Sequence, residues 1–150
     1  MSILRLDGDS AFPPPPHDAV AQFSERSAPR RRRVLVVDDE RLITDTVVQI
    51  LNIHGYDAFG AYSANEAMKL AENFHPDFLL SDVMMPGTNG IELAVAVQEM
   101  LPTVQVLLFS GQAGTSQLIE NRNLPFALEA KPIHPDKLIK TLENLGRRRR

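Results

Sequence analysis

The chain has 150 residues, 43% of them apolar, which suits one globular domain with a single core. It contains no cysteine, so disulfides, thiolate chemistry and cysteine-ligated metals are excluded. The formal net charge is −3, but eight of the 16 basic residues lie in two arginine runs, at 30–33 and 147–150. Residues 34–146 between the runs carry 15 acidic and 6 basic residues, so this acidic body should repel nucleic acid.

Signals for targeting are missing from the sequence. No apolar run approaches the roughly 18 residues of a membrane span, and the first nine residues lack the basic flank and apolar core of a signal peptide. We therefore expect a cytoplasmic protein without a membrane partner. Residues 1–32 include four consecutive prolines and no sustained apolar period, which predicts a disordered arm. An SH3-type ligand is the alternative interpretation of the prolines.

From residue 34 onward, short apolar runs alternate with amphipathic segments. The apolar runs predict strands at 34–37, 78–82 and 104–109, with weaker candidates at 56–62 and 126–130. Apolar residues spaced three and four apart predict helices over 42–54, 64–74, 91–101 and 135–145, and a short, polar helix over 112–123. Residues that stop helices follow four of these segments: Gly55, His75–Pro76, Pro102 and Gly146. The domain should thus span 33–145, with a basic tail at 146–150.

Strands alternating with helices predict a doubly wound α/β fold, in which a five-stranded parallel sheet is covered by helices on both faces. Ligands of such sheets bind beyond the carboxyl ends of the strands. The polar residues just past the predicted strand ends are Asp38, Asp39, Asp82, Ser110 and Lys131. We expect these five side chains to converge on one edge of the sheet.

Three clustered carboxylates raise one another's pKa unless they share a cation, and Mg²⁺ suits a site with few protein oxygens and several waters. Lys131 would add a mobile positive charge and Ser110 a hydroxyl donor. Together these groups can neutralise a transferring phosphoryl group, with one carboxylate as nucleophile. Structural alternatives remain open: Asp38 or Asp39 could cap a helix, and Asp82 could satisfy loop amides. Ser110 could likewise cap a helix, and Lys131 could be a solvated turn residue.

With these motifs in this order, the sequence resembles the receiver domain of two-component response regulators. Asp38–Asp39 matches the acidic pair of that family, and Ser110 matches its switch hydroxyl. Asp82, Met85–Pro86 and Gly90 match the phosphoacceptor motif D-x-x-M-P-x-x-x-G, and Lys131–Pro132 matches the Lys-Pro pair. The match runs from residue 33 to residue 145. It implies a flavodoxin-like fold with strand order 2-1-3-4-5 and five helices.

The resemblance also implies roles at the site. Asp82 would accept a phosphoryl group from a histidine kinase or phosphotransfer protein. Mg²⁺ would be bound by Asp39, by Asp82 and by the backbone carbonyl of Met84, and Asp38 would act through water. The domain would be a phosphoacceptor that assists its own Mg²⁺-dependent phosphorylation and dephosphorylation, and not an enzyme in the usual sense.

The implied switch involves Lys131, which would pair with Asp82 at rest and with phosphate oxygens afterwards. Its bond to Pro132 is usually cis in this family. Many receivers have a Tyr or Phe three residues before the Lys, and the residue here is Leu128. A leucine cannot report through ring rotation, so Leu128 is a departure at the switch position.

Because only Gly146 and four arginines follow residue 145, we expect a single-domain response regulator that signals by phosphorylation-dependent binding of a downstream protein. A phosphorylation-independent interaction module is one alternative, and Mg²⁺ binding would discriminate. Nucleic-acid binding through the arginine-rich termini is another, which would show as salt-dependent binding to DNA. An aspartyl-phosphate hydrolase would share the chemistry, but the D-x-D pattern of haloacid dehalogenases is absent.

Overall fold

The computed structural model describes residues 30–111 and 123–148. The fold belongs to the compact unit Arg31–Arg150. Most of the expected disordered arm lies outside the described residues, and so does all but the last residue of the helix expected at 112–123.

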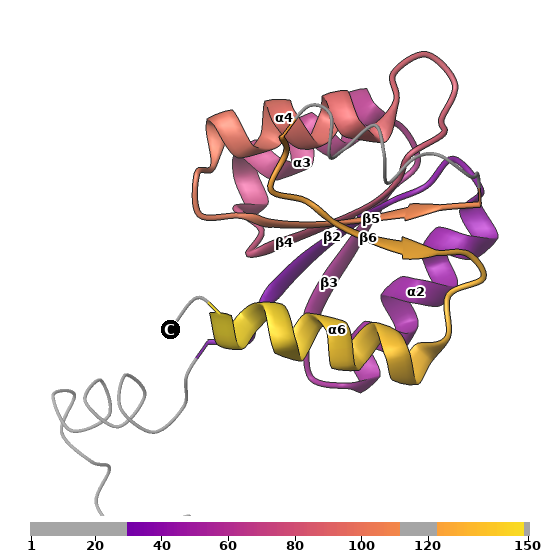
Figure 1. The fold of residues 1–150 in the computed structure, drawn as a ribbon, viewed down its shortest axis with the longest axis vertical. Coiled ribbons are helices and arrows are strands. Elements are labelled where there is room, and N and C mark those ends of the chain that lie inside the picture. Colours follow the sequence, from indigo (N-terminus) through magenta and orange to yellow (C-terminus); the bar gives the residue numbers. More distant parts are fainter. Residues whose placement is uncertain (1–29, 112–122, 149–150) are drawn as a thin grey trace, which may run out of the picture. The chain divides into compact units, whose positions relative to one another are not determined.

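Five strands form one parallel sheet (Figure 1). The order across the sheet is β3-β2-β4-β5-β6, which is 2-1-3-4-5 when the strands are counted along the chain, as expected. The strands are β2 (Arg33–Val37), β3 (Asp57–Ala61), β4 (Phe78–Asp82), β5 (Gln105–Ser110) and β6 (Ala127–Ala130). Each predicted strand is present, and no predicted strand end differs from the observed end by more than one residue. The doubly wound α/β fold is therefore confirmed.

Side chains of the central strands alternate between two cores, as the pleat of a sheet requires. Leu35 and Val37 belong to the core under α3 and α4, whereas Val34 and Val36 belong to the core over α2 and α6. The same alternation continues in β4 and β5, so the central strands are buried on both faces. Figure 1 shows the resulting three layers, with α3 and α4 on one face of the sheet and α2 and α6 on the other.

The described residues contain four helices: α2 (Arg41–Ile53), α3 (Ala64–Phe74), α4 (Gly90–Met100) and α6 (Pro135–Arg148). Ser63 caps α3 by accepting the Glu66 N–H, and the left-handed His75 ends that helix. The end at His75 agrees with the prediction. Asn89 caps α4 in the same way by accepting the Glu92 N–H at 2.8 Å. No described helix is long and apolar enough to cross a membrane.

The predicted end of the last helix is wrong. Gly146 does not stop α6, which continues to Arg148. A Cβ atom on Gly146 would lie 2.7 Å from Nη1 of Arg32, the far end of a flexible side chain, and the glycine is not in a left-handed turn. The first two residues of the expected basic tail after Gly146 are therefore helical.

Candidate functional site

The polar residues singled out in the sequence lie at the carboxyl edge of the sheet. Asp38 follows β2, Asp82 ends β4, Ser110 ends β5 and Lys131 follows β6. Asp38, Asp82 and Ser110 are buried, whereas Asp39 is exposed. This convergence follows from parallel pairing, because neighbouring strands in register end at the same level.

Three carboxylates form a cluster that can hold a metal ion. Oxygens of Asp38, Asp39 and Asp82 all lie within 4.8 Å of one another. Carboxylate oxygens are the ligands that hard divalent cations prefer, and three of them with one exposed side leave room for waters. The donor set therefore fits Mg²⁺.

The Lys131 ammonium lies between two of these carboxylates. Its Nζ is 3.2 Å from Oδ2 of Asp82 and 3.2 Å from Oδ2 of Asp38. The Lys131 backbone N–H donates to the Ser110 carbonyl at 3.0 Å, which ties the ends of β5 and β6 together. The bond from Lys131 to Pro132 is cis. Lys131 is therefore held in the cluster by contacts of both its side chain and its backbone, and it is not a solvated turn residue.

Burial and charge shift the pKa values of this pair. Burial raises the pKa of Asp82 and the charge of Asp38 adds to that shift, although Lys131 and the Met84 N–H act in the opposite direction. Burial alone would lower the pKa of Lys131, but its hydrogen bond to Asp82 and the charges of both carboxylates outweigh burial and raise it. The site thus favours the charged form of Lys131, whereas burial makes ionisation of Asp82 less favourable than in water.

Asp38 has a second function beside the cluster. Its Oδ1 accepts the Glu40 N–H at 3.0 Å, so Asp38 satisfies an amide at the start of α2 while its Oδ2 faces Lys131. Glu40, the formal N-cap, makes no side-chain cap hydrogen bond. Asp38 is therefore not the N-cap of α2: its side chain forms an Asx turn with the Glu40 amide just before the helix, which is compatible with a place in the cluster.

The sequence analysis missed Thr44. Its buried hydroxyl donates to the Asp38 carbonyl at 2.8 Å. A threonine on the apolar face of a predicted helix, five residues after the end of the acidic pair, is the only signal that could have marked it.

The loop after Asp82 is folded tightly against the end of β4. Oδ1 of Asp82 accepts the Met84 N–H at 3.3 Å, and the Gly90 N–H donates to the Val83 carbonyl at 2.7 Å. A Cβ atom on Gly90 would lie 2.1 Å from the Asp82 carbonyl oxygen, so only glycine fits there. Met84 is 53% exposed, and its side chain offers the cluster no oxygen ligand.

At the switch position, the structure has the aliphatic side chain of Leu128 and no aromatic ring. Leu128 lies in β6, is half-buried and packs against the core shared by α3 and α4. This aliphatic contact offers no polar or aromatic group to the site.

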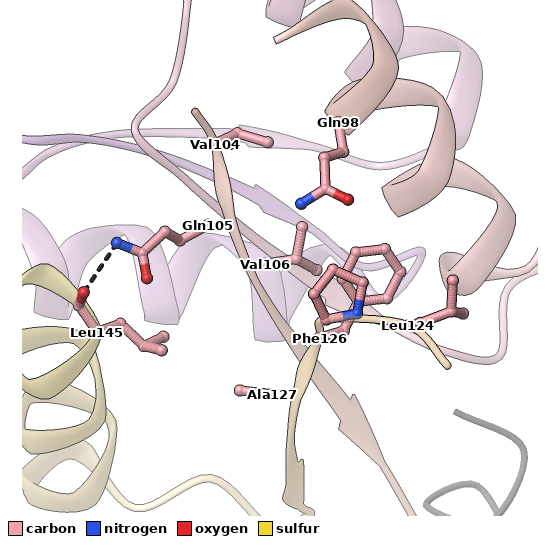
Figure 2. Close-up of a pocket in the computed structure, with 9 residues that line it drawn as sticks. Gln98, Val104, Gln105, Val106, Leu124, Phe126, Ala127 and Leu145 are labelled. Atoms are coloured by element: carbon pink, nitrogen blue, oxygen red, sulfur yellow. Dashed lines mark hydrogen bonds between the residues drawn. The ribbon is translucent and has the colours of Figure 1, made fainter. Parts of the chain in front are cut away.

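Two of the cavities formed by the described residues lie outside the carboxylate cluster. A cavity of about 430 Å³ lies at the amino ends of β5 and β6, where Nε2 of Gln105 donates to the Leu145 carbonyl at 2.8 Å (Figure 2). Asp82 is at the opposite edge of the sheet, at the carboxyl end of β4, so this cavity is not part of the site. An apolar groove of about 340 Å³ lies beside the cluster instead, lined by α2 and by the segment after β6 that includes Lys131. Leu42, on its rim, is 80% exposed.

Solved structures with similar folds include receiver domains. A receiver domain protein from Methanospirillum hungatei is 28% identical, with a TM-score of 0.70 over 77% of this chain and 93% of that one. The chemotaxis protein CheY4 of Vibrio cholerae is also 28% identical, with a TM-score of 0.71 over 77% of this chain and 98% of that one. The receiver domain of the hybrid histidine kinase CckA is 28% identical, with a TM-score of 0.64 over 75% and 96%.

The family model described as the response regulator receiver domain matches residues 34–143, which is most of the chain. The matched stretch contains every strand-end residue of the cluster. On this match and on the geometry of its carboxyl edge, the chain belongs to the response regulator receiver domain family.

Proposed function

We propose that this protein is a single-domain response regulator that accepts a phosphoryl group on Asp82 and signals through phosphorylation-dependent partner binding. Receiver domains of two-component signalling are phosphoacceptors and not enzymes in the usual sense. The observation that carries the assignment is the Lys131 ammonium, 3.2 Å from Asp82 within a cluster of three carboxylates. A structural ion pair would not require the third carboxylate.

Asp82 is the nucleophile in this proposal. A carboxylate oxygen of Asp82 attacks phosphorus as the bond from phosphorus to the donor's imidazole nitrogen breaks, and the electron pair of that bond returns to the ring. The product is an acyl phosphate on Asp82 and a donor histidine without its phosphoryl group. Asp38 and Ser110 are fixed in the structure by hydrogen bonds to their backbones, so they can border the reacting group without rearranging.

We assign the metal ligands to Asp39, to Asp82 and to the Met84 carbonyl. Asp38 would act through a bound water, as the resemblance to receiver domains implies, while its oxygens face the Glu40 N–H and Lys131. A bound Mg²⁺ would supply positive charge that offsets the negative charge of the phosphoryl oxygens. The exposed Asp39 is the ligand through which the ion can enter.

Lys131 and Ser110 are assigned to the product state. Before transfer, the Lys131 ammonium is shared between Asp38 and Asp82. After transfer, it can contact phosphoryl oxygens with little movement, and the Ser110 hydroxyl can donate to another of them. Because the Lys131 N–H donates a hydrogen bond to the Ser110 carbonyl, both residues would respond together to phosphorylation at the ends of β5 and β6.

The partner that delivers the phosphoryl group is a histidine kinase or a phosphotransfer protein. Similarity to the receiver of a hybrid histidine kinase supports this class of donor. Its phosphohistidine must reach Asp82, so its surface must contact the rim of the site, where the apolar groove and Leu42 are exposed. A downstream protein would read the phosphorylated form in the cytoplasm.

Transfer from a small phosphorus–nitrogen donor tests the proposal. With Mg²⁺ and phosphoramidate, the wild type should gain a label that hydroxylamine releases, as expected for an acyl phosphate, and Ser81→Ala should behave alike. Ser81 is a suitable control because its buried hydroxyl donates to the Asp82 carbonyl at 3.0 Å and not to the carboxylate. A hydroxylamine-stable label, or an equal label on Asp82→Asn, would show that Asp82 is not the acceptor.

A further inference from the structure

Thr44 is a fully buried polar residue in the first turns of α2, with a relative exposure of 0%. Its hydroxyl donates to the Asp38 carbonyl at 2.8 Å. This carbonyl lies beyond the end of β2 and before the first residue of α2, so neither the sheet ladder nor the helix supplies it with a donor. Among the described residues, Thr44 is the donor that satisfies it.

The hydrogen bond from Thr44 completes the fixation of Asp38. The Asp38 N–H donates to the Ala61 carbonyl at 3.3 Å, Oδ1 accepts the Glu40 N–H at 3.0 Å and Oδ2 lies 3.2 Å from Lys131 Nζ. These contacts hold the strand end and the side chain, whereas the Thr44 contact holds the peptide group that leads into Asp39. The orientation of that peptide sets where the Asp39 carboxylate points.

Gly60 in β3 provides the space that Thr44 occupies. A Cβ atom on Gly60 would lie only 2.5 Å from Cγ2 of Thr44. The methyl group of Thr44 therefore packs directly on the β3 backbone, and the glycine leaves room for the rotamer in which the hydroxyl reaches Asp38. Gly60 weakens the strand pattern in the sequence, and this contact is the structural reason for a glycine there.

We infer that Thr44 is a positioning residue, for which Gly60 leaves room, and that it orients the Asp38–Asp39 turn for metal binding. The inference rests on the proposed function for the identity of the metal. Thr44 itself touches neither the metal nor the phosphoryl group. Loss of an outer hydrogen bond typically costs a metal site about 10- to 100-fold in affinity, and one backbone contact belongs near the low end.

The test compares three variants in the full chain by Mg²⁺ titration calorimetry and thermal unfolding. Thr44→Val keeps the methyl packing and loses the hydroxyl, and we expect about tenfold weaker Mg²⁺ binding. Thr44→Ser keeps the hydroxyl and loses the methyl, so it should unfold at a lower temperature yet bind Mg²⁺ like the wild type. Thr46→Val makes the same chemical change at an exposed position of α2 and should alter neither.

Gly60→Ala tests the position of Thr44 independently, from the side of β3. Its methyl group should push Thr44 aside and weaken Mg²⁺ binding although the hydroxyl is retained. Adding Thr44→Ser to Gly60→Ala removes the colliding Cγ2 atom and should restore binding. Wild-type affinity in Thr44→Val, or equal losses in Thr44→Val and Thr44→Ser, would overturn the inference.

Metal-free hydrogen exchange separates this inference from the proposed function. Without Mg²⁺, the Glu40 amide, which donates to Asp38, should exchange faster in Thr44→Val than in Thr44→Ser. If the wild type fails to bind Mg²⁺, the proposed function is wrong, and the exchange rates still decide whether Thr44 positions the turn. Equal Glu40 exchange in both variants contradicts positioning.

Discussion

Lys131 is the residue that converts a cluster of repelling carboxylates into a defined site. Its ammonium contacts Asp82 and Asp38 at the same distance of 3.2 Å, so it neutralises neither of them fully. Lys131 and a bound metal are therefore competing cations for the same oxygens. Each of them would compensate part of the cost of ionising buried Asp82, the form that acts as nucleophile in the proposed function.

The first prediction follows from this competition. Lys131→Ala should leave Mg²⁺ affinity unchanged or raise it, because a competing cation is removed, and should abolish the effect of phosphorylation on partner binding. Lys131→Arg should also lose that effect, since a planar guanidinium does not replace a compact ammonium in a close site. Titration calorimetry and a pull-down with phosphorylated protein measure the two properties. Normal switching in both variants would remove Lys131 from the mechanism.

A second prediction concerns pH and Asp82. The pKa of Asp82 is raised above its ordinary value of 3.8, chiefly by burial, so the folded protein binds this proton more tightly than the unfolded chain does. The free energy of unfolding therefore falls as pH rises through the window between the two pKa values, and stays reduced above it. Without divalent metal, Asp82→Asn should be more stable than the wild type at pH 7.

The advantage of Asp82→Asn should shrink as pH falls toward 3.8, where wild-type Asp82 becomes protonated in both states. Urea unfolding in EDTA across this range measures it. Addition of Mg²⁺ should stabilise the wild type by about 1.4 kcal/mol at ten times the dissociation constant and Asp82→Asn by less. A stability difference that does not change with pH would contradict the assigned cause.

At the scale of elements, α2 contributes to the site twice. Its buried face carries Thr44, which holds the acidic turn, and its exposed face carries Leu42 beside the apolar groove. An 80% exposed leucine next to an acceptor site is suited to contact a protein donor and irrelevant to a small-molecule donor.

The third prediction separates these two kinds of donor. Leu42→Ala should slow phosphoryl transfer from a protein donor by about tenfold, since a buried leucine contributes roughly 1.5–3 kcal/mol. Its rate with acetyl phosphate should not change. Ile53→Ala is the matched control, because Ile53 is 74% exposed at the far end of α2. Equal slowing with both donors would indicate damage to the site and not loss of a docking contact.

Helix α6 ends against the start of β2, where Gly146 meets the Arg32 guanidinium. Gly146→Ala should gain helix propensity of about 0.5–1 kcal/mol, yet its Cβ displaces Arg32 from the face of Phe78, where the guanidinium lies 5.8 Å from the ring centroid. That cation–π contact contributes a similar amount, about 0.5–1 kcal/mol, so the single change should be nearly neutral.

The fourth prediction is a double-mutant cycle on this pair. In an Arg32→Ala background nothing opposes the helix propensity, and Gly146→Ala should stabilise the protein by about 0.5–1 kcal/mol. Urea unfolding of the four proteins measures the coupling. An equal effect of Gly146→Ala in both backgrounds would show that Arg32 does not explain the glycine.

At the scale of the whole molecule, charge is separated along the strand direction. The carboxylate cluster lies at the carboxyl edge, whereas Arg32 and Arg147 line one cavity of about 190 Å³ at the opposite edge. One described residue of each arginine run thus lines this cavity, although the two residues are more than 100 positions apart in sequence. The basic groups described there are too remote from Asp82 to act in the phosphoryl transfer itself.

The strand order and the converging edge could be predicted because they depend on local patterns and general rules. Apolar runs too short for helices gave the strands, and parallel pairing brought Asp38, Asp82 and Lys131 together. The roles of Gly146, Gly60 and Thr44 could not be predicted, because each depends on a contact with a distant residue. In the sequence Gly146 has the pattern of a helix stop, and only the structure shows that it lies inside α6 and against Arg32.

The central claim is that Asp82 alone accepts a phosphoryl group with help from a divalent cation. Intact-mass measurement after acetyl phosphate and Mg²⁺ tests it most directly. Wild-type protein should gain the mass of one phosphoryl group, whereas Asp82→Asn, or wild type in EDTA, should gain none. A wild type without added mass, or an Asp82→Asn variant that gains it equally, would contradict the account.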